Sequence, residues 1–139
     1  MKAGNALFLT ITIMFLSPIV FGQNQEQPPE KSPVELASYQ AERMQKDLGL
    51  KDYQLFLVDS VLQRNYTDLK AKIEEMRLTG IQTRESYSSV QDGFAAKIDD
   101  AFEKIFDKVQ FTKYLKMSGR LKLYMKRKEA ETKKEVETK

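Results

Sequence analysis

The side chains that most often perform nucleophilic, acid–base or metal chemistry are nearly missing from this sequence. Its 139 residues contain no Cys, no His and no Trp. Disulfide scaffolds, thiolate or imidazole zinc sites and nucleophiles activated by histidine are therefore excluded. The sequence also contains no phosphate-binding loop and no nucleophile paired with a base. We predict that the protein is not an enzyme and that it uses no cofactor.

One acidic group has the oxygen atoms that a divalent cation would require. Asp99, Asp100, Glu103 and Asp107 lie close together in the sequence. A calcium site needs about six to eight converging oxygen ligands, more than this group supplies by itself. We therefore interpret the group as a solvated helix face and predict no metal site.

Two glutamines occur in the same local pattern. Gln54 follows Leu50 and Gln110 follows Phe106, each by four residues and just inside an expected helix. Asp107 is suited to cap the second of these helices. A glutamine amide one turn into a helix can hydrogen-bond backbone groups that the helix end leaves free. We interpret both glutamines as structural residues with no direct role in activity.

The elements that must position these residues are all helical. Capping signals and apolar residues at helical spacing predict helices over residues 33–48, 52–79 and 83–106, and a fourth helix beginning near Asp107. No stretch alternates with the period of a strand. The expected fold is all-α, with four helices joined as antiparallel hairpins in an elongated, cradle-like molecule. The expected apolar face of the fourth helix consists of Phe111, Tyr114, Leu121 and Met125.

The N-terminal segment is typical of a secretory signal. Lys2 precedes an apolar run over residues 6–20, and Gly22 is a small residue before a cleavage site at Gln23. The run is shorter than the roughly 18 to 20 residues of a spanning helix, so we predict cleavage after residue 22 and not a retained anchor. The mature protein is then expected in the periplasm and does not span the membrane.

The mature chain divides into three segments. Residues 23–32 are polar, include two prolines and are expected to form a disordered linker. Residues 33–126 form the helical domain. Residues 127–139 form a charged C-terminal tail, which we expect to fray.

The paired glutamine elements resemble the repeated Leu-Thr-x-x-Gln motifs of the Spy/CpxP family of small exported helical proteins. The similarity extends over about residues 34–126. It departs from the family pattern at Lys51, which has no side-chain acceptor to replace the capping threonine. The resemblance implies a thin, curved, cradle-like dimer that binds unfolded or stressed envelope proteins without ATP and limits their aggregation. Some relatives instead bind and restrain an envelope stress sensor kinase, which we keep as the alternative function.

Some apolar side chains point away from the expected core stripes. These residues are Phe56, Leu57, Leu115 and Leu123. Large apolar patches on a monomer usually mark an interface. We therefore interpret these residues as a surface for unfolded clients or as the seam of a homodimer, and the sequence leaves both uses open.

Charge is distributed unevenly along the chain. Residues 111–139 carry 10 Lys and Arg against 4 Glu, whereas residues 24–110 carry 12 against 16 acidic residues. The basic end can attract acidic clients, anionic lipid headgroups or the acidic segment of a partner, or it can serve only as a solubilising tail. Nucleic acid is not expected as a partner, because the chain carries an export signal.

Overall fold

The computed structural model describes residues 31–137, and this part of the chain is all-α, as predicted. The expected export segment, residues 1–22, lies outside the described residues, as does most of the expected linker. No strand occurs within residues 31–137. The helices are α1 (Pro33–Leu48), α2 (Asp52–Leu78), α3 (Arg84–Ile105), α4 (Lys108–Met117) and α5 (Leu121–Glu137).

The first helix begins and ends where the sequence predicts. Ser32 and Glu35 form a capping box, in which the Ser32 hydroxyl accepts from the Glu35 N–H at 3.2 Å and the Glu35 carboxylate accepts from the Ser32 N–H at 2.9 Å. Gly49 ends the helix with a left-handed φ of 65°. The predicted apolar face is confirmed, because Ala37, Ala41, Met44 and Leu48 are all buried.

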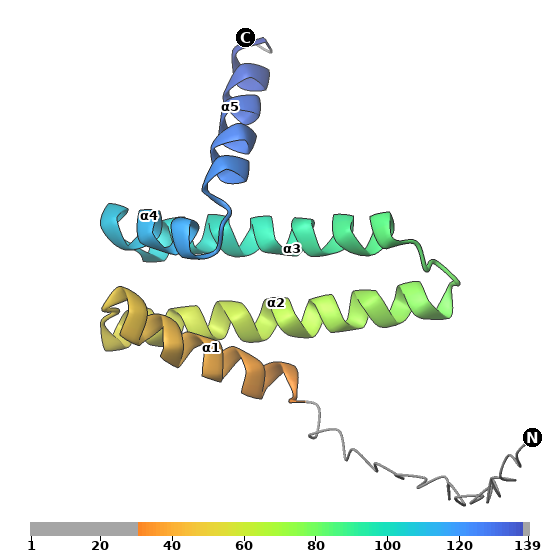
Figure 1. Ribbon diagram of the computed structural model, residues 1–139, viewed down its shortest axis with the longest axis horizontal. Coiled ribbons are helices and arrows are strands. Elements are labelled where there is room, and N and C mark those ends of the chain that lie inside the picture. Colours follow the sequence, from red (N-terminus) through yellow and green to blue (C-terminus); the bar gives the residue numbers. More distant parts are fainter. Residues whose placement is uncertain (1–30, 138–139) are drawn as a thin grey trace, which may run out of the picture.

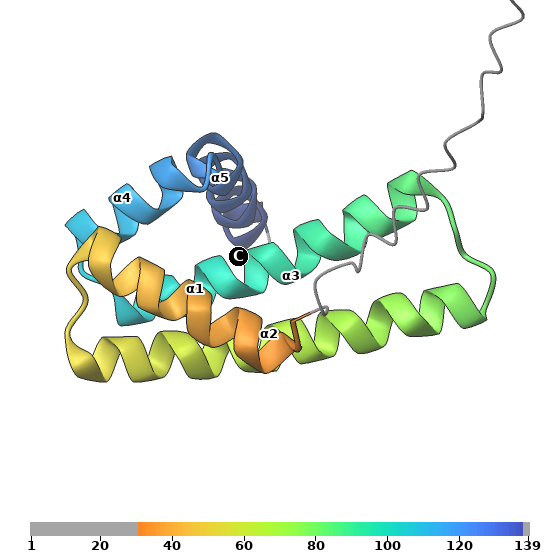
Figure 2. The ribbon, with the colours of Figure 1, turned by 60° about the horizontal axis from the view of Figure 1, so that its bottom comes forward.

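The helices form a thin layered body with its core near the α1–α2 and α3–α4 junctions. α1 packs on α2, α2 packs on α3, and α4 contacts both α1 and α3. Figures 1 and 2 show α2 and α3 as a long hairpin, with α1 and α4 at the end opposite its turn. Phe102 is fully buried there, with its ring centroid 5.0 Å from that of Phe106 and 5.1 Å from that of Tyr114.

The unequal lengths of α1 and α2 leave part of α2 uncovered by α1. α1 has 16 residues and α2 has 27, or roughly 24 Å and 40 Å at 1.5 Å per residue. The Ser38 hydroxyl donates to Asp59 at 3.0 Å and fixes the register of the two helices. From this register the N-terminal end of α1 lies beside Tyr66, and α2 continues beyond it as far as Leu78.

The prediction of a single fourth helix is wrong, because the helix is interrupted at Gly119 and the chain forms two helices, α4 and α5. Gly119 has a left-handed φ of 68°, and the N–H of Arg120 donates to the Leu115 carbonyl at 3.0 Å. This hydrogen bond closes the end of α4, and α5 starts in a new direction. Met125, expected on the core face, is 52% exposed.

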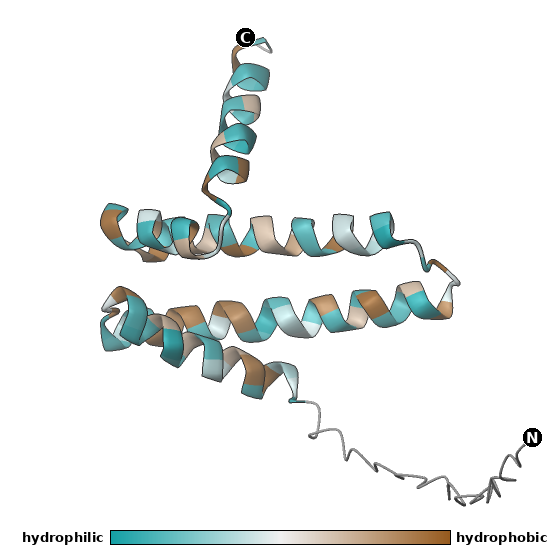
Figure 3. Cartoon of the chain, viewed as in Figure 1, coloured by the Kyte–Doolittle hydropathy of each residue, from teal (hydrophilic) through white to brown (hydrophobic). Residues whose placement is uncertain are grey.

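The last helix, α5, extends away from the body of the molecule (Figure 1). It is helical to Glu137, so the segment beyond residue 126 is regular, and its fraying stays a prediction. Figure 3 shows that most of α5 is hydrophilic. Tyr124 is the residue of α5 that is buried, and its ring packs edge-on against Phe111 with the centroids 5.2 Å apart.

Candidate functional site

Gln54 and Gln110, far apart in the sequence, meet at the junction of the two helix pairs. The Gln54 amide nitrogen donates to the Gln110 side-chain oxygen at 2.8 Å, and the Gln110 amide nitrogen donates to the Gln54 oxygen at 3.3 Å. Gln54 also donates to the Ile105 carbonyl at 3.0 Å, and Gln110 to the Gly49 carbonyl at 3.3 Å. Gln54, in α2, therefore closes the end of α3, and Gln110, in α4, closes the end of α1.

Each glutamine also caps its own helix. The N–H of Lys51 donates to the Gln54 oxygen at 3.0 Å, and the N–H of Asp107 donates to the Gln110 oxygen at 3.1 Å. Asp107 completes a capping box by accepting from the Gln110 N–H at 2.8 Å. The Lys51 side chain has no acceptor atom, so α2 has the hydrogen bond from the Lys51 N–H to Gln54 but no side-chain cap from Lys51. The backbone hydrogen bonds predicted for both glutamines are present, and Leu50 and Phe106 are buried beside them.

The surface residues singled out from the sequence divide into two groups. Phe56, Leu57 and Leu123 are 70%, 41% and 58% exposed. Leu115 is only 2% exposed, so its assignment to the surface is wrong. The reason is that α4 contacts both α1 and α3, and a helix covered on two sides buries an apolar arc wider than a single stripe. Leu115 belongs to the core and cannot contact clients or a second copy.

The acidic group is a solvated face only in part: Glu103 and Asp107 are exposed, but Asp99 is buried. Asp99 is 5% exposed; it forms an ion pair with Arg120 and accepts from the Tyr114 hydroxyl at 2.8 Å. Arg120 also donates to the Ala95 carbonyl at 2.7 Å. Burial raises the pKa of Tyr114 above its ordinary value. This cluster joins the α4–α5 turn to α3, a tertiary role that sequence spacing does not reveal.

The neighbouring carboxylates attach α5 to α3 through ion pairs. Asp100 forms two hydrogen bonds with the Arg127 guanidinium, at 2.8 and 2.9 Å, and Lys128 lies 3.3 Å from both Asp100 and Glu103. The pKa of Asp100 is lowered chiefly by its hydrogen bonds to Arg127, and that of Glu103 chiefly by the Tyr124 hydroxyl. Within residues 31–137, no group of three or more acidic side chains is arranged to hold a metal ion.

An open apolar cleft lies where α1 begins beside α2. Its volume is about 480 Å³. It exists because the apolar stripe of α2 continues past the end of α1. Its charged residues are both lysines, and no carboxylate lines it. The lining residues are Lys31, Pro33, Leu36, Tyr66, Leu69, Lys70 and Ile73.

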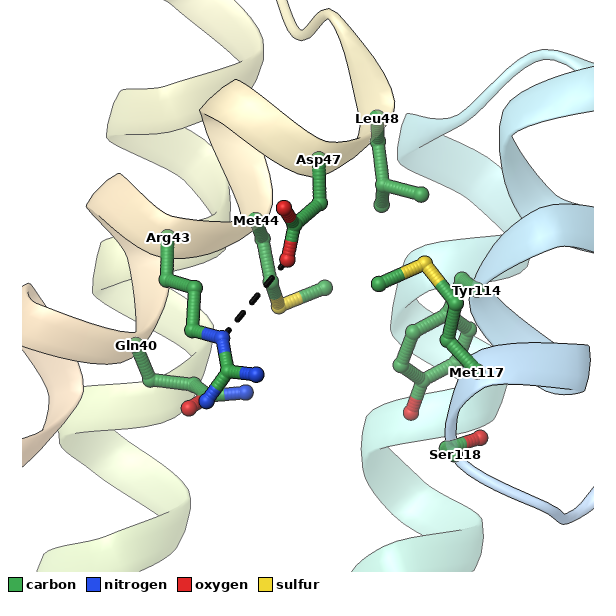
Figure 4. Close-up of a pocket in the computed structure, with 8 residues that line it drawn as sticks. All are labelled: Gln40, Arg43, Met44, Asp47, Leu48, Tyr114, Met117 and Ser118. Atoms are coloured by element: carbon green, nitrogen blue, oxygen red, sulfur yellow. Dashed lines mark ion pairs between the residues drawn. The ribbon is translucent and has the colours of Figure 1, made fainter.

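A smaller cleft of about 190 Å³ separates α1 from α4. Figure 4 shows Met117 extending from α4 toward Met44 on α1, with Tyr114 beneath it. Arg43 and Asp47 form an ion pair of 3.6 Å at its edge. Met44 is buried, and Met117 is 54% exposed at this cleft.

Searches of protein-family models, curated proteins and solved structures find no match to this chain. Of the helices within residues 31–137, none combines the length and apolar character needed to cross a membrane.

Proposed function

We propose that this protein is an ATP-independent, chaperone-like protein of the cell envelope that binds unfolded or stressed proteins and limits their aggregation. The observation that carries the proposal is the open apolar cleft between the start of α1 and α2, which we call the client cleft. Leu36 is 45% exposed, Leu69 and Ile73 are partly exposed, and all three line this open cleft. An open apolar groove of this kind is typical of a binding site for apolar segments.

The charge around the client cleft supports binding of chains rather than chemistry. Lys31 and Lys70 line a cleft that has no acidic residue, so acidic groups beside an apolar client segment are attracted. A shallow, solvent-open cleft with flexible lysines favours loose and exchangeable contacts. The resemblance of the Gln54 and Gln110 elements to the Spy/CpxP motifs agrees with this use.

Self-association is part of the proposal. Phe56, Leu57 and Leu123 lie outside the client cleft and remain exposed. Exposed apolar groups in such positions favour contact with a second copy. We propose a homodimer as the smallest assembly, and sedimentation as an elongated species of at least twice the monomer mass is the expected observation.

The aggregation of an unrelated protein that unfolds on heating tests the proposal. We expect the purified exported protein to suppress light scattering at near-stoichiometric ratios without ATP. The variant Leu36→Ser/Ile73→Ser should lose most of this effect, because it removes two apolar side chains of the client cleft. The control variant Leu78→Ser/Val109→Ser removes residues that are 75% and 78% exposed elsewhere, and it should keep the effect.

Two outcomes would contradict the proposal. One is no suppression at any ratio or salt concentration. The other is equal suppression by the cleft variant and the unsubstituted protein, with both folded by circular dichroism. A single saturable partner in an envelope extract, with no activity on generic clients, would instead match the sensor-kinase alternative.

A further inference from the structure

A second groove between α1 and α2 is chemically different from the client cleft and shares no residue with it. It has a volume of about 270 Å³, and we call it the acidic groove. Three carboxylates and no Lys or Arg line it. Its lining residues are Ser38, Ala41, Glu42, Asp52, Leu55, Phe56 and Asp59.

The acidic groove combines unpaired negative charge with an exposed ring. Within residues 31–137, no ion pair is formed by Glu42, Asp52 or Asp59. Asp59 accepts hydrogen bonds from the neutral side chains of Ser38 and Gln63, which leave its charge uncompensated. Phe56 lies between Asp52 and Asp59 on the same side of α2 and is 70% exposed. The groove is therefore suited to a segment with lysines placed around an apolar side chain.

α5 presents a face with this pattern. The side of α5 turned toward α3 and α4 carries Tyr124, Arg127 and Lys128, as their contacts with Phe111, Asp100 and Glu103 show. The opposite side carries exposed lysines around Leu123, which is 58% exposed. Glu129, three residues after Lys126 and four before Lys133, lies on the same side, and so does Glu137 at the last turn of the helix. The lysines of this face, for which the described structure gives no ion pair, are Lys122, Lys126 and Lys133.

The two surfaces of one molecule cannot meet. α5 is tied to α3 by the Arg120–Asp99 and Arg127–Asp100 ion pairs. Figure 1 shows α5 directed away from the α1–α2 pair. The complementary surfaces can come together only between two molecules.

We propose that α5 of one copy docks, through Lys122, Leu123 and Lys126, in the acidic groove of a second copy. This contact rests on the proposed self-association but not on client binding, since the client cleft stays open. It joins two different surfaces, so each dimer keeps one free α5 and one free groove, and further copies add head to tail. A contact made by one helix face is small, so the association is weak and is strengthened at low salt.

Sedimentation velocity of the purified exported protein over a concentration series at low salt tests this contact. The groove variant is Glu42→Gln/Phe56→Ser/Asp59→Asn, and the arm variant is Lys122→Gln/Leu123→Ser/Lys126→Gln. Each variant alone should associate at least about tenfold more weakly than the unsubstituted protein. The matched control Asp68→Asn/Leu78→Ser/Glu85→Gln removes two exposed carboxylates and one exposed apolar side chain elsewhere, and it should associate normally.

Mixing the two variants gives the decisive result. The groove variant retains an intact α5, and the arm variant retains an intact groove, so an equimolar mixture should form a 1:1 heterodimer that grows no further. A mixture that stays monomeric would overturn the proposal, as would normal association of either variant alone. Binding of α5 to anionic vesicles without any self-association would also overturn it. Aggregation suppression is measured separately, so a failed contact leaves the proposed client binding intact.

Discussion

Gln54 and Gln110 hydrogen-bond to each other in both directions, with donor–acceptor distances of 2.8 and 3.3 Å. Each amide also bonds backbone groups at both helix junctions, so the pair ties the α1–α2 turn to the α3–α4 turn. Gln54 is 4% exposed, and water cannot easily replace these bonds. The pair fixes the relative position of the two halves of the molecule.

The glutamine pair should behave as a coupled unit in unfolding experiments. Gln54→Met leaves part-buried backbone groups without partners and should cost about 2 kcal/mol of unfolding free energy. Gln110→Met frees exposed backbone groups and should cost about 1 kcal/mol. The double variant should lose about 1 kcal/mol less than the sum of the two single-variant losses. The reason is that the hydrogen bonds between Gln54 and Gln110 are already absent in either single variant. Urea unfolding measures all three values. Gln91→Met, on an exposed position of α3, is the control, and strict additivity would contradict the coupling.

The sequence predicts the first three helices well because their signals are local. Ser32 caps α1, Gly49 ends it, and the buried face of α1 follows from spacing alone. Leu115 and Asp99 were misassigned because their burial depends on contacts distant in sequence. The burial of Leu115 requires both α1 and α3, and Asp99 is paired with Arg120 from beyond the end of α4. Gly119 in Ser-Gly-Arg was the available signal for the break.

Replacing Gly119 or Gly93 by alanine should change the unfolding free energy in opposite directions. Gly119 has φ of 68°, where an alanine side chain is strained, although no atom lies within 4 Å of its added Cβ. Gly119→Ala should therefore lower the unfolding free energy by about 1 kcal/mol or slightly more. Gly93 lies within α3, also in open space, and Gly93→Ala should raise stability by about 0.5 to 1 kcal/mol. Thermal unfolding distinguishes these signs, and the same sign for both variants would contradict the backbone argument.

The buried ion pair of Asp99 and Arg120 should control how firmly α5 is attached. Asp99→Asn leaves the Arg120 guanidinium half-buried without a counter-charge, and we expect a loss of about 2 kcal/mol or more. The double variant Asp99→Asn/Arg120→Met should lose less than the sum of the single variants. Hydrogen exchange should accelerate for the amides of α5 in Asp99→Asn. Asp92→Asn, an exposed substitution on the same helix, should leave exchange unchanged, and faster exchange there too would show that the effect is not specific.

Lowering the pH should weaken, over a defined pH range, the ion pairs that attach α5 to α3. The pKa values of Asp100 and Glu103 are lower in the folded protein than their ordinary values. Both groups therefore stabilise the folded state above about pH 5, and this contribution is lost as pH falls through the ordinary values near 4 and then the lower folded values. The stability difference between the unsubstituted protein and Asp100→Asn/Glu103→Gln should shrink over that range. A difference that stays constant down to about pH 3 would contradict the assignment.

The charge of the client cleft should select among apolar segments. Lys31 and Lys70 line the cleft and no carboxylate lines it, although Glu35 lies near Lys31 and Glu74 lies near Lys70 outside the cleft. An apolar peptide with acidic flanks should therefore bind more tightly than the same peptide with basic flanks. Fluorescence anisotropy at low salt measures this ratio, which should decrease when salt is raised to about 0.3 M. Lys70→Glu should reduce the ratio at low salt, whereas Lys116→Glu, the same charge change on α4, should not. Equal affinities for both peptides would mean that the lysines do not contribute to client choice.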